Sequence, residues 1–145
     1  MNNTAKGSKP LPRGLRNCNT GNIRISPTKY QGEIIPSCDR AFKQFRSLGW
    51  GYRAMFVLLE SYKKRGFDTI RKMISRWAPP SENNTAGYIQ RVCDGCLHGA
   101  DEVIDTRDKN VMVLIVCAMS KVENGVPANM ADVLEGWDLF ITHKA

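Results

Sequence analysis

The sequence predicts an α+β fold, mainly helical with a small β-hairpin, and three observations indicate this class. Most of the chain after residue 36 carries apolar residues at helical spacing between residues that cap or break helices. Two-residue alternation is confined to a short stretch before that point. The 145 residues, 42% of them hydrophobic, suffice for one core without disulfides or metal. We therefore expect a disordered basic leader at residues 1–12 and a single domain at residues 13–145.

A polar loop and the hairpin open the predicted domain. Residues 13–26 read RGLRNCNTGNIRIS, and their three asparagines and two glycines favour turns over regular structure. Ile23–Ser26 and Tyr30–Ile35 then alternate between apolar and polar residues. We expect these two segments to pair around Pro27 and Thr28.

Six helices are expected after the hairpin, with boundaries at typical capping or breaking residues. Ser37 or Asp39 can cap the first, Gly66 ends the second and Pro79 stops the third. The fifth is apolar on nearly all faces, so we expect it to run through the middle of the domain. The expected helices cover residues 37–48, 52–64, 68–77, a segment around 88–92, 109–123 and 129–136.

The net charge of +7 is concentrated at the start of the chain, because residues 1–32 hold six Lys or Arg and no acid. Such a segment suits binding to a polyanion, either nucleic acid or the anionic bacterial wall. The chain has no zinc-finger spacing and no aromatic ribonucleoprotein motif. Nucleic acid is therefore the disfavoured partner, although a helix-turn-helix stays open.

No apolar run approaches the roughly 20 residues of a transmembrane helix, so we expect no membrane span. The segment MNNTAKGSKPLPRG also lacks the apolar centre of a secretory signal peptide. We expect synthesis in the cytoplasm and, for a protein that leaves the cell, a route such as phage lysis or contact-dependent injection.

Five cysteines are an odd number, which favours free thiols made in a reducing compartment. Cys93-Asp-Gly-Cys96, with His98 nearby, has the spacing of half a zinc site or of a redox pair. A second ligand pair at usable spacing is missing, since the other histidine is His143. We therefore expect no metal and no cofactor.

One carboxylate has an unusual position. Glu123, in the stretch AMSKVENG, comes at the last turn of the most apolar helix, where the helix dipole and burial both raise a carboxyl pKa. A carboxyl that keeps its proton near neutrality can act as a general acid on a glycosidic oxygen. Asn17, Asn19 and Asn22 are suitable for gripping sugar hydroxyl and acetamido groups. The alternative is a solvent-facing glutamate at a frayed helix end.

Several segments resemble bacterial cell-wall glycosidases. NCNTGNIR resembles the Asn-Asn-Leu-Phe-Gly-Ile-Lys signature of glucosaminidases in the lysozyme-like superfamily, and YQGEI and DRAFKQFRS follow in that family's order. SENNTAGYIQRV is similar to the Glu-Thr-x-x-Tyr-Val-x-x-Val motif of soluble lytic transglycosylases. The whole chain resembles a phage-associated family with the pattern Arg-Gly-x-Arg-Asn-Asn-Asn-Pro-x-Asn-Ile-Arg, then Arg-Trp-Ala-Pro-Pro-x-Glu-Asn, usually labelled a structural protein.

The resemblance implies a circular permutation. In those glycosidases the catalytic glutamate precedes the asparagine motif, on a helix that often contains Ala-x-x-x-x-Glu-Ser-Gly. Here the best match, CAMSKVENG, comes near the other end of the chain. Permutation is physically easy because chain termini often lie close together. We therefore expect a permuted lysozyme-like domain with Glu123 as the general acid.

The resemblance also implies roles for other residues. A second carboxylate, if used, would come from the hairpin region, with Glu33 as first candidate and Asp39, also a possible helix cap, as second. Glu82 competes with Glu123 for the catalytic role, and Tyr88 corresponds to a tyrosine near the reacting sugar. Apart from the resemblance, Arg24 and Trp50 are two further candidates for substrate contact, whereas Trp77, at helical spacing with Ile70 and Ile74, is expected in the core.

The expected function is cleavage of the peptidoglycan glycan backbone, by a muramidase, glucosaminidase or lytic transglycosylase, at the bacterial wall or in a virion. Cys18 and Thr20 stand where the related pattern has asparagine and proline, which we expect to loosen the loop. One alternative is an inactive phage structural or wall-binding protein, and a third is a basic nucleic-acid-associated protein. A toxin delivered into rival cells would need a cognate immunity protein that plugs the cleft.

Overall fold

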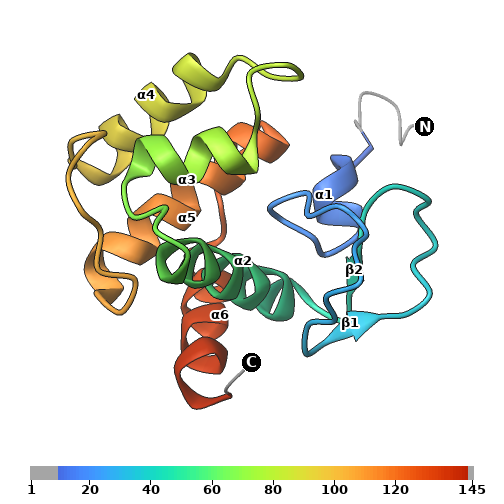
Figure 1. The fold of residues 1–145 in the computed structure, drawn as a ribbon. Coiled ribbons are helices and arrows are strands. Elements are labelled where there is room, and N and C mark those ends of the chain that lie inside the picture. The colour runs from blue at the N-terminus through green and yellow to red at the C-terminus, as the bar shows by residue number, and fades with distance from the viewer. Residues whose placement is uncertain (1–9, 144–145) are drawn as a thin grey trace, which may run out of the picture.

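Helices dominate the structure, a computed structural model that describes residues 10–143 (Figure 1). One two-stranded antiparallel sheet is formed within these residues, so the mainly helical α+β class is confirmed. Residues 1–9 of the expected leader lie outside the described residues. The elements are α1 (Arg13–Arg16), β1 (Glu33–Ile34), β2 (Gln44–Phe45), α2 (Leu48–Lys64), α3 (Ile70–Trp77), α4 (Thr85–Cys96), α5 (Lys109–Asn124) and α6 (Met130–Thr142).

Side-chain caps set the helix starts. The Asp108 carboxylate accepts a backbone N–H at the start of α5, and Gly125, in the left-handed region with φ 74°, ends this helix. α2 begins earlier than expected because the Ser47 hydroxyl accepts the Trp50 N–H. The end of α5 is therefore well defined, and with it the position of the residues in its last turn.

The predicted pairing within the hairpin and the helix predicted at residues 37–48 are both wrong. β1 pairs with β2, and an isolated bridge joins Arg24 to Phe42. The segment after residue 36 therefore serves as strand partner to both predicted strands. The reason is a turn at Asp39, whose carboxylate accepts two backbone N–H groups of the following residues and so favours a turn over a helix.

α5 is buried or half-buried on most of its surface, and the expected burial on nearly all faces fails along the strip that carries Leu114. Met112, Ile115 and Met119 are fully buried in the main core, which α2, α3, α4 and α6 complete. Leu114, on the other face, is 41% exposed. The apolar composition of this helix reflects both a core face and an exposed apolar face.

α6 packs along α2 and is longer than expected. Trp137 and Phe140 belong to α6 and extend its buried face, and both contact the ring of Phe56 in α2. The helices approach closely at Gly136, where a Cβ would lie 2.5 Å from the Tyr52 Cβ. The sequence placed the helix end at this glycine, whereas the tertiary contact requires a glycine inside the helix.

The loop and sheet at the N-terminal end pack on one side of α2, and α3 and α4 lie on the other (Figure 1). Ile23, Phe45 and Ala54 form a second, smaller core there. Trp77 at the end of α3 packs against both cores and donates its indole N–H to the Gly21 carbonyl at 3.1 Å. This bond anchors the polar loop to α3.

Candidate active site

The last turn of α5 places Glu123 beside two side chains from distant parts of the chain. The Asn22 amide N–H donates to Oε1 of Glu123 at 2.9 Å, and the Tyr88 hydroxyl donates to Oε2 at 3.0 Å. Asn22 has φ 49°, in the left-handed region that asparagine adopts more readily than most residues. The polar loop, α4 and α5 each contribute one residue, so the site exists only in the folded protein.

The surroundings of Glu123 favour the acid form of its carboxyl more than water does. Burial raises the pKa of this carboxyl above its ordinary value, and the hydrogen bonds from Asn22 and Tyr88 offset part of that effect. Tyr88 is itself buried, and burial together with the nearby Glu123 charge raises its pKa well above the usual range. Tyr88 therefore stays a neutral donor, and Glu123 is suited to give up a proton from a partly desolvated position.

Two cavities meet at Glu123. A smaller one, of about 200 Å³, is lined by Asn84, Gly87, Tyr88 and Arg91, among others. A larger one, of about 420 Å³, lies toward the polar loop and α3. Both are lined by Glu123 and by Asn83. A bound chain could therefore pass the carboxyl with one segment in each cavity.

Of the three asparagines in the polar loop, only Asn22 reaches Glu123. Asn19 is fully buried, where its side chain exchanges two hydrogen bonds with the Ile23 backbone and donates to the Lys43 carbonyl. Asn17, also buried, donates to Asp39. These two residues shape the loop and line neither cavity at Glu123.

Gly14 packs closely against the amide side chains of Asn22 and Asn124 next to the site. A Cβ there would lie 2.4 Å from Oδ1 of Asn124 and 2.9 Å from Oδ1 of Asn22.

We expect Gly14→Ala to cost about 1–3 kcal/mol of unfolding free energy, because overpacking displaces both amides. The same displacement should slow any reaction that depends on the Asn22–Glu123 bond. Urea unfolding measures the cost, and Arg16→Ala, on the exposed side of α1, is the control. An unchanged midpoint in Gly14→Ala would contradict the packing.

Glu82 and Arg24 face each other on the larger cavity. The Arg24 Nη2 lies 3.3 Å from Oε1 of Glu82, and both side chains are more than half exposed, at 66% and 60%. Glu82 therefore lies at the rim of the site, in ordinary contact with solvent, whereas Glu123 is half-buried between two donors.

Glu33 and Asp39, the hairpin candidates for a second carboxylate, are engaged elsewhere. Glu33 forms an ion pair with Lys43 at 3.0 Å, with side-chain exposures of only 6% and 1%. Asp39 pairs with Arg13, and this contact holds the pKa of the Asp39 carboxyl well below its usual range. Neither residue lines the cavities at Glu123. A buried lysine requires a counter-ion, which is why Glu33 turns inward.

The aromatic residues at the site differ from those expected. Trp50 contacts His143 edge-on and lines neither cavity, whereas Trp77 packs against both cores, as expected of a core residue, and also lines the larger cavity. Arg76 and Asn83 also line the larger cavity and were missed. The signal that could have found them is the segment RWAPPSEN, which matches the second half of the phage-associated pattern.

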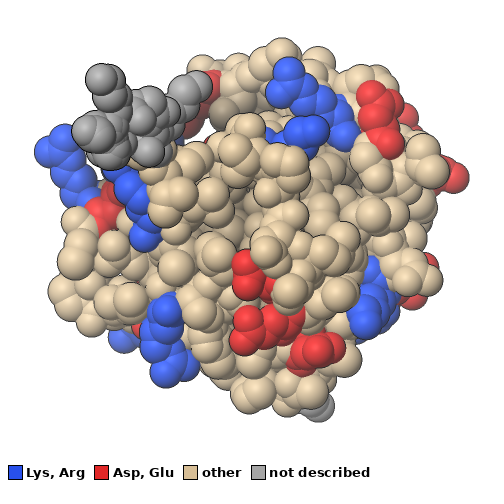
Figure 2. All heavy atoms as spheres, turned by 180° about the vertical axis from the view of Figure 1, so that it is seen from behind, with Lys and Arg blue, Asp and Glu red and all other residues tan. Residues whose placement is uncertain are grey.

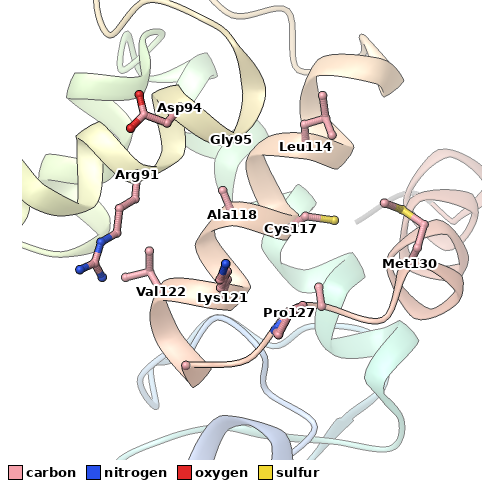
Figure 3. A pocket seen from close by; sticks show the side chains of 12 residues that line it. Arg91, Asp94, Gly95, Leu114, Cys117, Ala118, Lys121, Val122, Pro127 and Met130 are labelled. Carbon is pink, nitrogen blue, oxygen red and sulfur yellow. The ribbon is translucent and has the colours of Figure 1, made fainter.

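A further hollow, of about 740 Å³, does not include Glu123 (Figure 3). It lies against the exposed face of α5, where Leu114, Cys117 and Met130 provide apolar surface and Arg91 and Lys121 lie toward its other end (Figure 3). Burial raises the pKa of the Cys117 thiol, which disfavours the nucleophilic thiolate. This hollow lacks the paired acid and donors found at Glu123.

The surface charge, the helix lengths and the possible metal ligands are relevant to the partners expected from the sequence. On the face in Figure 2, the basic side chains of the described residues stand apart, separated by uncharged surface, rather than in one stripe. No helix within residues 10–143 is long and apolar enough to cross a membrane. The same residues hold no group of three or more His, Cys, Asp or Glu placed to bind a metal ion.

Comparisons with known proteins give one clear relationship. No family model matches the chain. It is 31% identical over 131 residues to Protein P5 of Pseudoalteromonas phage PM2, an alignment that covers 87% of this chain and 80% of that protein.

Proposed function

We propose, since this chain belongs to the family of Protein P5 of Pseudoalteromonas phage PM2, that it is a phage protein that cleaves the glycan backbone of peptidoglycan. The observation that carries the proposal is the Glu123 carboxyl, held by one donor on each oxygen at the junction of two cavities. A phage must pass the bacterial wall to enter or leave its host, and such an activity serves that step.

The meeting of three motif segments supports the glycosidase class. Asn22 comes from NCNTGNIR, Tyr88 from SENNTAGYIQRV and Glu123 from CAMSKVENG, the three stretches that resemble wall-glycosidase motifs. The hydrogen bonds of Asn22 and Tyr88 to Glu123 bring all three to one point. A circularly permuted lysozyme-like arrangement accounts for this meeting despite the altered order along the chain.

In the proposed reaction, protonated Glu123 donates its proton to the glycosidic oxygen as the bond to the anomeric carbon breaks. The leaving sugar departs as an alcohol, and positive charge develops at the anomeric carbon. The substrate's acetamido group or a water then completes the reaction, and the Glu123 carboxylate takes up the released proton. Asn22 and Tyr88 hold the carboxylate in place and stabilise its charge between the two steps.

The pH dependence tests the role of Tyr88. Cleavage should decline as pH rises through the raised pKa of Glu123, because the acid form is lost. Tyr88→Phe removes a hydrogen bond that favours the charged form, so we expect the alkaline limb to move to higher pH.

Stability provides a second readout of the same pKa. A carboxyl whose pKa is higher in the folded than in the unfolded state binds more protons when folded, so stability falls as pH rises from its ordinary pKa through the raised one. The pH range over which stability falls should widen in Tyr88→Phe and vanish in Glu123→Gln. For cleavage, an alkaline limb of the pH profile that moves to lower pH in Tyr88→Phe would contradict the role assigned to Tyr88.

The direct test is release of soluble muropeptides from purified peptidoglycan, analysed by mass. Product masses distinguish reducing from anhydro sugars and name the bond that is cut. Release by the wild type that persists in Glu82→Gln and is lost in Glu123→Gln is the expected result. Correctly folded wild type that releases nothing would overturn the proposal.

A phage structural or wall-binding protein without catalysis is the second candidate, and the relationship to a phage protein favours it. Such a protein would co-sediment with peptidoglycan equally well before and after Glu123→Gln. Cys18 and Thr20 do not decide between the two, because the Thr20 hydroxyl is buried and donates to the Met55 sulfur, and Cys18 lines neither cavity.

A further inference from the structure

We propose that Arg24 and Arg76 form a carboxylate-binding subsite in the larger cavity, which selects acidic, muramic-acid-bearing glycans over neutral polymers of N-acetylglucosamine. When no substrate is bound, the Glu82 carboxylate pairs with the Arg24 guanidinium. This inference rests on the proposed function and assigns a substrate feature to the same cleft.

Both arginines line the cavity, and aromatic rings hold both guanidinium groups. The Arg24 guanidinium carbon lies 5.2 Å from the centre of the Phe42 ring, and that of Arg76 lies 4.6 Å from the centre of the Phe67 ring. Stacking on a ring restricts the guanidinium while leaving its N–H groups free to bind an anion. Arg24 comes from the polar loop and Arg76 from the last turn of α3, so the two belong to different segments of the cavity wall.

Within the described residues, one guanidinium of the cavity, that of Arg76, has no carboxylate partner. Arg24 has the exposed carboxylate of Glu82 at 3.3 Å, a contact of a kind that is weak and easily exchanged. Across residues 10–143, Arg76 takes part in none of the ion pairs. Apart from Glu123, whose two oxygens accept hydrogen bonds from Asn22 and Tyr88, a single carboxylate therefore faces the two guanidinium groups in this cavity.

Peptidoglycan offers the complementary group. Every second sugar of its backbone carries a lactyl ether that ends in a carboxylate, or, where that carboxylate is amidated, a peptide with its own carboxylates. A polymer of N-acetylglucosamine alone carries neither. Arginine binds a carboxylate through two parallel N–H bonds, so such a group could displace Glu82 from Arg24 and also meet Arg76.

Binding to the full chain carrying Glu123→Gln separates recognition from cleavage. Three probes are compared by calorimetry: di-N-acetylchitobiose, the peptide-free disaccharide of N-acetylglucosamine and N-acetylmuramic acid, and the same disaccharide with its peptide. We expect the peptide-free acidic disaccharide to bind roughly tenfold or more tightly than chitobiose, as for a charged hydrogen bond gained. Tight binding by the peptide-bearing disaccharide alone would place the recognised carboxylate on the peptide instead of the lactyl group.

Substitutions then assign the subsite. Arg24→Gln and Arg76→Gln should each remove most of the preference for the acidic probe, whereas Glu82→Gln should strengthen binding because it frees Arg24. Arg65→Gln is the matched control, since Arg65 stacks on Tyr62 and Phe67 but does not line the cavity. Thermal unfolding verifies that each variant is folded.

The outcomes separate this inference from the proposed function. Equal binding of chitobiose and the acidic disaccharides, with cleavage of peptidoglycan by the wild type intact, overturns the subsite and leaves the proposed function standing. Arginine variants that keep the full preference overturn it in the same way. If no probe binds and the wild type releases no muropeptides, both proposals fall.

Discussion

Glu123→Gln is expected to abolish release of muropeptides from peptidoglycan, with a loss of at least about 10²–10⁴-fold in rate, the usual contribution of a general acid. The substitution removes the transferable proton and little else. The carbonyl of the new side-chain amide can still accept from Asn22, and its NH₂ group can donate to the Tyr88 hydroxyl in place of the present bond. The fold should therefore persist, which thermal unfolding verifies.

Glu82→Gln is the matched control for this prediction. It makes the same chemical change on the same cavity, but at an exposed rim position paired with Arg24. We expect it to keep cleavage, because the change at Arg24 tightens rather than weakens binding of an acidic substrate. Loss of cleavage in Glu82→Gln with cleavage retained in Glu123→Gln would reverse the assignment of the acid, and loss in neither would exclude both residues as the essential acid.

Lys43→Met is expected to destabilise the fold by about 3–5 kcal/mol, the usual cost of leaving one partner of a buried ion pair uncompensated. Lys43 and Glu33 are almost fully buried, and the lysine ammonium also donates to the carbonyls of Ser26 and Thr28. Because Lys43 directly precedes β2, its side chain links the loop before β1 to the start of β2. Urea unfolding measures the loss.

The double variant Lys43→Met with Glu33→Leu tests whether the unpaired Glu33 carboxylate causes the loss of stability. Replacing both charges by apolar groups removes the unpaired carboxylate, so most of the lost stability should return. The double variant should also keep cleavage, because Glu33 lines neither cavity at Glu123. A loss below about 1 kcal/mol in Lys43→Met would contradict the buried pair, and a folded double variant without cleavage would restore Glu33 as a candidate for catalysis.

Predictions from local sequence succeeded where local chemistry decides. Asp108 caps α5 and Gly125 ends it, as the caps in the sequence indicated, and this places Glu123 in the last turn. The same logic located α3, which ends before Pro79. Capping and proline effects act within a few residues, so they can be recognised without knowledge of the fold.

Predictions failed where a distant partner decides. The segment after residue 36 has helical spacing, yet it pairs with Arg24 and with β1 because Asp39 forms a turn and Arg13, 26 residues away, binds that carboxylate. For a similar reason, Trp50 lies outside the cavities at Glu123, whereas Trp77 lines one of them in addition to packing against both cores. Which one lines a cavity depends on the contact of Trp77 with the Gly21 carbonyl, 56 residues away.

The sequence by itself determined the fold class, the positions of the main helices and the presence of a glutamate at the end of an apolar helix. Those features depend on periodicity and capping between near neighbours. Only the tertiary structure decided which polar residues meet that glutamate. Asn22, 101 residues away, and Tyr88, 35 residues away, reach it because α5 packs against α4 and the polar loop is anchored to α3, contacts that no local pattern encodes.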